Sequence, residues 1–132
     1  MFHFGTASKS RLSTCHPDIQ RLLNECIKHV DFSVVCGMRG KEDQNRAFDD
    51  GKSTVRWPNS KHNINPSEAV DVAPYVNGIA WEDTEGFTLL AGIIKGISLM
   101  MGIKVRIGVD WDGDGLVNEH RFIDRPHIEL VR

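Results

Sequence analysis

The sequence predicts a small α+β domain in which helices pack on one face of a small antiparallel sheet and leave the other face open. Apolar residues recur at helical spacing in two long segments, and they alternate with polar residues in short segments between and after these helices. The chain has 132 residues, enough for one hydrophobic core but not for two. We therefore expect a single domain over residues 1–132.

Periodicity in the first half predicts two helices and two strands. Pro17 suits the first turn of the first helix, and Gly51 suits a left-handed cap after the second. In the second strand, Asp71 shares a face with its small alanine neighbours, and valines point the other way. The expected elements are a helix over 17–30, a strand over 32–36, a polar helix over 41–50 and a strand over 68–75.

The second half is expected to add one long helix and two strands. The helix carries its large apolar residues at helical spacing, and several glycines suit close packing on the sheet. Alternation of apolar and polar residues indicates a half-buried strand next, and the last strand places His127 on the same face as Glu129. The expected elements are a helix over 84–101, a strand over 103–109 and a strand over 127–130.

Two patches of polar residues have the composition of a catalytic zinc site. Such a site uses three protein ligands drawn from His, Asp, Glu and Cys, and it leaves one position open. His62, Asp71 and His127 can fill the three places. Asp124, three residues before His127, is a spare carboxylate that can take a proton as water attacks a carbonyl. The sequence therefore predicts a zinc hydrolase with Asp124 as its base.

Three blocks of sequence, in order and at similar spacing, resemble the zinc peptidases of bacterial cell walls, which include D-alanyl-D-alanine carboxypeptidases and phage L-alanyl-D-glutamate endopeptidases. The resemblance implies zinc ligation by His62, Asp71 and His127, catalysis by Asp124 and transition-state support from Arg39. The blocks are Cys36-Gly37-Met38-Arg39 with Gln44, Ser60-Lys61-His62 through Ala69-Val70-Asp71-Val72-Ala73-Pro74, and Asp124-Arg125-Pro126-His127-Ile128-Glu129-Leu130.

An acidic, glycine-rich segment before Asp124 predicts a calcium site. Aspartates at alternate positions followed by glycine match the first half of an EF-hand loop, in which carboxylate oxygens converge on the ion. The rest of the segment is shorter than an EF-hand loop. Its nearest later acid, Glu119, comes two residues before the place where the standard loop has its last glutamate. An acidic turn without metal is the alternative. The expected ligands are Asp110, Asp112, Asp114, Glu119 and the carbonyl of Leu116.

Composition indicates which partners and which cellular compartment to expect. The net charge is −2 and basic residues are scattered, which argues against nucleic acid. Three cysteines without Cys-x-x-Cys spacing are read as free thiols from a reducing cytoplasm. The N-terminus lacks the pattern of a signal peptide, and the apolar segment 87–103 is too interrupted for stable membrane insertion. We expect a monomer made in the host cytoplasm that reaches the periplasm through a lesion made by another protein.

These observations predict a zinc-dependent phage-type endolysin that hydrolyses peptidoglycan stem peptides during host cell lysis. The bond expected, L-alanyl-D-glutamate, comes from the resemblance and its Asp-x-x-His ending, because carboxypeptidases of the family more often show Glu-x-x-His there. A D-alanyl-D-alanine carboxypeptidase is the nearest alternative. A module that binds metal and cell wall without cleaving it is another, although binding alone needs no spare base such as Asp124.

Overall fold

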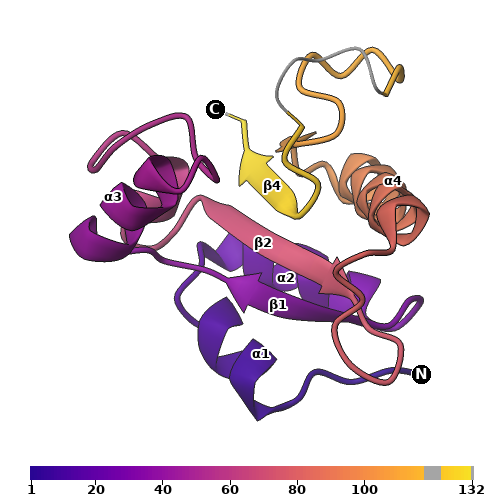
Figure 1. Cartoon of the computed structure of the whole chain (residues 1–132). Helices are drawn as coiled ribbons and strands as arrows, with labels where there is room; N and C mark the ends of the chain where they lie inside the picture. The colour runs from indigo at the N-terminus through magenta and orange to yellow at the C-terminus, as the bar shows by residue number, and fades with distance from the viewer. Residues whose placement is uncertain (118–122, 132) are drawn as a thin grey trace.

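The backbone forms a four-stranded antiparallel sheet with the strand order β1-β2-β4-β3 (Figure 1). The structure is a computed structural model, and it describes residues 1–117 and 123–131. The strand expected over residues 103–109 is paired only at its centre, although Ile103 and Val109 on either side are buried as their pattern predicts. The strands are β1 (Phe32–Cys36), β2 (Ala69–Pro74), β3 (Val105–Ile107) and β4 (His127–Leu130).

Four α-helices and one short 3-10 helix accompany the sheet in the described residues. The first was not expected, because its seven residues bury only Ser8 and Leu12 and so show no periodic pattern. The helix expected to reach Val30 ends at Cys26, and turns follow it. The helices are α1 (Thr6–Leu12), α2 (Pro17–Cys26), α3 (Lys41–Asp49), η1 (Lys61–Asn63) and α4 (Thr84–Met101).

The sheet has one apolar face and one polar face. Val70, Val72 and Ile128 belong to the buried core, which also contains the apolar sides of α2 and α4. In Figure 1, α2 lies behind the sheet, and α2 also packs against α4. Alternation along the strands turns Asp71 and His127 to the other face. The expected α+β arrangement, with helices on one face and the polar residues on the other, is confirmed.

Strand register brings the polar residues of the open face together. Asp71 pairs directly with His127 across β2 and β4, and such cross-strand neighbours have Cβ atoms about 5 Å apart. On the other side of Asp71, the register shifts by one residue between Val34 and Cys36. This β-bulge makes Cys36, instead of Val35, the partner of Asp71 and re-aims its side chain.

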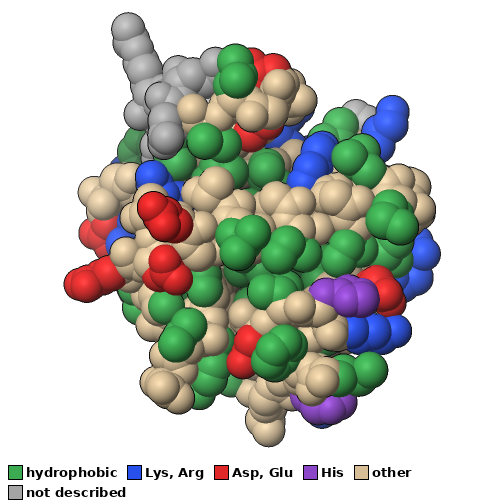
Figure 2. All heavy atoms as spheres, turned by 90° about the vertical axis from the view of Figure 1, so that its right-hand side faces the viewer, with side chains coloured by type: hydrophobic (Ala, Val, Ile, Leu, Met, Phe, Trp, Pro, Cys, Tyr) green, Lys and Arg blue, Asp and Glu red, His purple; other side chains and the backbone are tan. Residues whose placement is uncertain are grey.

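The outer side of α4 is exposed and apolar. Leu89, Leu99 and Met100 are all exposed there, and Figure 2, drawn from this side of the molecule, shows hydrophobic side chains spread across it. Among the described residues, α4 is the one helix long and apolar enough to cross a membrane by length and composition. Its inner residues Phe87 and Ile94 lie in the core, which explains much of that composition. The absence of stable membrane insertion remains a prediction.

Candidate metal centre

Asp71 lies at the centre of the polar cluster. Its Oδ1 is 3.3 Å from Nε2 of His62 and 3.4 Å from Nδ1 of His127. Ligand atoms about 2.1 Å from one tetrahedral zinc ion lie about 3.4 Å from each other. Each of these two separations is one that a tetrahedral site has, although His62 and His127 belong to two different groups of possible metal ligands that share Asp71. The three residues predicted as ligands come from η1, β2 and β4, and the structure brings all of them together.

Each histidine has its second ring nitrogen fixed by an acceptor. Nδ1 of His62 lies 2.7 Å from the carbonyl oxygen of Gly37, and Nε2 of His127 lies 2.9 Å from Oε1 of Glu129. A carbonyl or an ionised carboxylate only accepts hydrogen bonds, so these two nitrogens carry the protons. The other two nitrogens face Asp71, and in the neutral imidazoles that bind metal they would carry the lone pairs. Such outer partners orient metal-binding histidines in known sites.

The loop before β2 holds His62 through local hydrogen bonds. Ser60 caps η1 by accepting from the backbone N–H of His62, and Asn63 accepts from the backbone N–H of Ser60 in return. The carbonyl of His62 accepts from the backbone N–H of Arg39 at 2.8 Å. Gly37 must stay small, because a Cβ there would lie 2.4 Å from the carbonyl oxygen of Arg11. The His62 ring is thus held from two sides.

Arg39 lies against Asp71 and is only partly exposed. Its guanidinium donates to Oδ2 of Asp71 at 3.2 Å and to Oε1 of Gln44 at 3.1 Å. Gln44 is fully buried and donates in turn to Ser53 and to the carbonyl of Val55, so it ties α3 to the loop beside the cleft. The sequence marks Gln44 only as part of a motif. Its bridging position depends on contacts that no local pattern shows.

Asp124 lies at the edge of the cluster, with Oδ2 3.9 Å from Nδ1 of His127. Burial and the nearby charge of Asp71 raise the pKa of Asp124 to about 6. A group with such a pKa exchanges protons readily near neutral pH. Gly108 permits this approach, since a Cβ there would lie 1.9 Å from the carbonyl oxygen of Asp124.

The ionisable groups of the cluster shift one another's pKa values. Burial alone would raise the pKa of Asp71, but His62 and His127 hold it well below its usual range. Burial alone would lower the pKa of His62, but the carboxylate of Asp71 raises it to about 10. Burial would also raise the pKa of Glu129. The hydrogen bond from His127 and the charge of Lys61 outweigh this effect and keep the pKa below its usual value. These shifts describe a site arranged around compensating charges.

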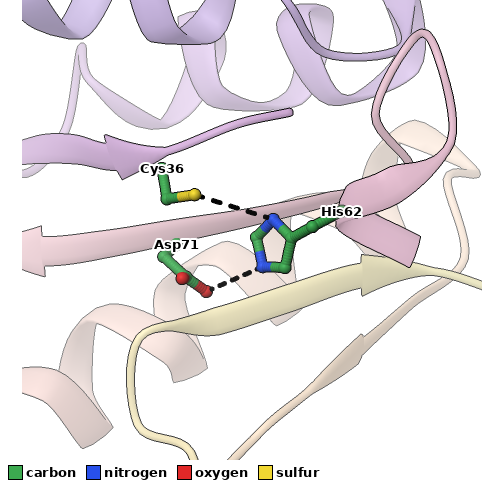
Figure 3. A group of neighbouring side chains, drawn as sticks. All are labelled: Cys36, His62 and Asp71. Atoms are coloured by element: carbon green, nitrogen blue, oxygen red, sulfur yellow. Dashed lines mark hydrogen bonds and ion pairs between the residues drawn. The ribbon is translucent and has the colours of Figure 1, made fainter. Parts of the chain in front are cut away.

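Cys36 is a neighbour that the sequence analysis treated as a free thiol and as part of a motif, without a role in the site. Figure 3 shows Cys36 and Asp71 next to different nitrogens of the His62 ring, with Sγ 4.0 Å from Nδ1 of His62. Cys36, His62 and Asp71 form one possible metal-binding group, and Asp71, Asp124 and His127 form another. The thiol faces the nitrogen that the Gly37 carbonyl already engages, whereas Asp71 faces the other ring nitrogen. The bulge that places it there leaves no mark in the sequence.

The acidic loop also gathers its carboxylates. Ligand atoms of Asp110, Asp112 and Asp114 all lie within 4.8 Å of one another. Backbone N–H groups of Gly115 and Leu116 donate to Asp110 and Asp114 at 2.8 Å each, which folds the loop around its acids. Glu119, the fourth expected side-chain ligand, lies outside the described residues.

A cleft of about 260 Å³ opens over the cluster. The segment between Lys52 and Lys61 lines one side of it, and Trp111 lies beside His127 with the ring centroids 5.4 Å apart. Arg39, Asp124 and both histidines also line the cleft. A peptide bond entering this space would therefore meet both histidines, the spare carboxylate and a guanidinium together.

The chain is similar to known proteins over nearly its whole length. A family model described as phage L-alanyl-D-glutamate peptidase matches residues 1–131. The L-alanyl-D-glutamate peptidase of Escherichia phage T5 is 31% identical, over 98% of this chain and 98% of that protein. The crystal structure of the L-Ala D-Glu endopeptidase ChiX of Serratia marcescens matches with a TM-score of 0.76 and 26% identity, covering 98% of this chain and 90% of that one. The chain therefore belongs to the phage L-alanyl-D-glutamate peptidase family.

Proposed function

We propose that this protein is a zinc-dependent peptidoglycan endopeptidase that cleaves the L-alanyl-D-glutamate bond of the stem peptide. Family membership supports peptidase activity on peptidoglycan, and the names of two relatives supply the bond. The single observation that carries the metal is the convergence of His62 and His127 on Oδ1 of Asp71 at 3.3 and 3.4 Å. Two imidazoles and one carboxylate form a common catalytic zinc donor set.

The donor set fits zinc in chemistry, and each histidine lies at ligand spacing from Asp71. His62 would bind through Nε2 and His127 through Nδ1, because their other nitrogens are bonded to Gly37 and Glu129. Zinc bound there would supply a Lewis acid that polarises the scissile carbonyl and makes water a better nucleophile at neutral pH. Glu129 and the Gly37 carbonyl hold the two rings in the required tautomers.

Asp124 takes the proton of the attacking water and delivers it to the leaving amine. Its place in the cleft and its pKa of about 6 suit both halves of that transfer. Arg39 holds Asp71 through Oδ2 and presents the rest of its guanidinium to the cleft, where it stabilises negative charge on the tetrahedral intermediate. These roles use only side chains that line the same cleft.

We also propose that calcium orders the acidic loop and thereby positions the segment from Asp124 to His127. The clustered carboxylates of Asp110, Asp112 and Asp114 support a hard cation with oxygen ligands. Substituting Asp112 and Asp114 by Ala should then remove any calcium dependence of hydrolysis. Equal activity with and without calcium in both proteins would refute this regulation.

The deciding experiment is mass spectrometry of muropeptides after purified peptidoglycan is incubated with zinc-loaded protein. Release of stem peptides that begin at D-glutamate is expected, and loss of a terminal D-alanine alone would identify a carboxypeptidase instead. Asp124→Asn should abolish release while zinc content is kept, whereas the exposed Asp43→Asn should leave release unchanged. Binding of peptidoglycan without any cleavage would favour a non-catalytic module.

A further inference from the structure

A second hollow adjoins the metal cleft on the far side of Asp124. It has a volume of about 330 Å³, and its lining includes Lys52, Trp81, Phe87, Asp124 and Arg125. Lys52 and Asp124 line both this hollow and the metal cleft. The two spaces are therefore neighbouring regions of one surface, with Asp124 between them.

Two cations, Lys52 and Arg125, line this second hollow. Arg125 has a buried Nε with no hydrogen-bond partner, and within residues 1–117 and 123–131 neither Lys52 nor Arg125 has an acidic side chain at ion-pair distance. The cations of the metal cleft differ, because Arg39 pairs with Asp71 and Lys61 pairs with Glu129. The positive charges of Lys52 and Arg125 would therefore favour an anionic ligand in the hollow.

An aromatic surface lies beside these cations. Trp81 is 56% exposed and stacks on Phe87, with the ring centroids 6.2 Å apart and the planes 29° apart. Phe87 is buried in the core, so it fixes the ring of Trp81 from below. An exposed indole of this kind suits the hydrocarbon portion of a ligand whose charged end reaches the cations.

The chemistry of the substrate indicates which group belongs here. A D-glutamate residue within a peptide has two carboxyl groups, and only one of them can be joined to the next residue. A free carboxylate therefore remains within a few bonds of the scissile nitrogen. Asp124 must approach that nitrogen to protonate it, so the leaving residue lies on the Asp124 side of the metal cleft, where the second hollow begins.

We propose that the hollow lined by Lys52, Trp81 and Arg125 is the subsite for the leaving D-glutamate residue, with Lys52 and Arg125 binding its free carboxylate. This inference rests on the proposed function and adds the residues that select the substrate. Charge-assisted hydrogen bonds to a carboxylate change affinity by about 10- to 100-fold. A substrate in which the same carboxylate is amidated should lose that advantage.

Two synthetic stem peptides test the proposal, one with the free carboxylate on D-glutamate and one with the corresponding amide. The zinc-loaded wild-type protein should cleave the acid with a kcat/KM at least about 10-fold higher, mainly through a lower KM. Lys52→Gln and Arg125→Gln should remove this preference by slowing cleavage of the acid alone. Arg125→Lys should keep most of it, and the exposed Lys104→Gln should behave like wild type.

Other outcomes separate the subsite from the proposed function. Equal cleavage of acid and amide by wild type, or an equal loss on both peptides in Lys52→Gln, would overturn the subsite while the endopeptidase stands. If wild type cleaves neither peptide, the proposed function fails. The subsite is then tested separately, by calorimetric binding of the two D-glutamate product peptides. Selective binding of the acid that disappears in Lys52→Gln would retain the subsite, and binding without selectivity would overturn it.

Discussion

At the scale of single residues, the site depends on one largely buried carboxylate, Asp71, which several partners share. Oδ1 of Asp71 lies close to a ring nitrogen of His62 and of His127, and Oδ2 forms an ion pair with Arg39. A buried charge is tolerated only when it is paired and hydrogen-bonded, and these contacts provide both. Glu129 has a similar role farther from Asp71, where it accepts from His127 and pairs with Lys61. Residues outside the ligand set therefore decide how the ligands point.

Glu129→Gln should weaken zinc binding. The amide keeps the shape of the side chain but loses the charge that makes His127 a better donor to metal. Loss of such an outer partner lowers metal affinity by about 10- to 100-fold. Competition with a chromophoric zinc chelator measures the effect, and Glu25→Gln on the exposed end of α2 is the control. Unchanged affinity in folded Glu129→Gln would contradict the role of Glu129.

The three thiols should differ in reactivity. Burial raises the pKa of Cys15 to about 11 and that of Cys26 to about 12, so both stay protonated at neutral pH. Only the thiolate reacts readily with alkylating agents. Cys36 is half-buried, so iodoacetamide should modify it first in the native protein. Mass spectrometry locates the label, and equal labelling of all three cysteines before unfolding would contradict the burial.

At the scale of elements, strand register and close backbone contacts place the site. Asp71 and His127 are neighbours because β2 and β4 pair in one register, and a slip of one residue would turn each to the core face. The segment of Asp124 is fixed by paired hydrogen bonds, since Gly108 accepts from the N–H of Asp124 at 3.1 Å and donates to the carbonyl of His127 at 2.8 Å. Small changes in backbone spacing there should therefore displace Asp124 and lower activity.

Gly108→Ala tests this dependence. The new methyl group would meet the backbone of Asp124, which cannot rotate away as a side chain could. We expect a loss of activity of about 100-fold from misplaced Asp124, and a loss of stability of about 1–3 kcal/mol. Steady-state kinetics and urea unfolding measure the two effects.

Gly96→Ala is the matched control for that substitution. Gly96 lies on the exposed side of α4, where a Cβ would meet nothing within 4 Å. Alanine should therefore stabilise the helix by about 0.5–1 kcal/mol and leave activity unchanged. Normal activity in Gly108→Ala, or similar effects of both substitutions, would show that the contact with Asp124 is unimportant.

At the scale of the whole molecule, the proposed zinc ion would link three segments that are far apart in the sequence. Its three ligands lie on η1, β2 and β4. The core lies on the opposite face, so the polar face has no hydrophobic layer of its own. Metal binding would therefore contribute to stability as well as to catalysis.

Zinc removal should abolish activity and lower stability. At a free zinc concentration about 100 times the dissociation constant, binding adds about 2.7 kcal/mol to the free energy of unfolding. Urea unfolding with and without zinc measures this difference. His127→Ala should lose it, while the exposed His29→Ala should keep it. A wild-type protein whose stability does not respond to zinc would contradict the proposed site.

The family and the helical and extended segments were predictable from the sequence, because they depend on residue type and short-range periodicity. α2, α3 and α4 lie where periodicity places them, apart from their ends, and the family match agrees with the motifs around His62 and Asp124. α1 was missed, since seven residues carry too little apolar pattern. The roles of the individual site residues stay predictions.

By itself, the sequence determined which side chains are available for chemistry, because metal donors and proton-transfer groups belong to few residue types. Only the tertiary structure decided how they meet. The β-bulge that brings Cys36 to His62, the Glu129 carboxylate on His127 and the hollow that joins Lys52 to Trp81 and Arg125 all depend on contacts between distant segments. Such contacts follow from strand register and packing of the whole chain, and no local pattern encodes them.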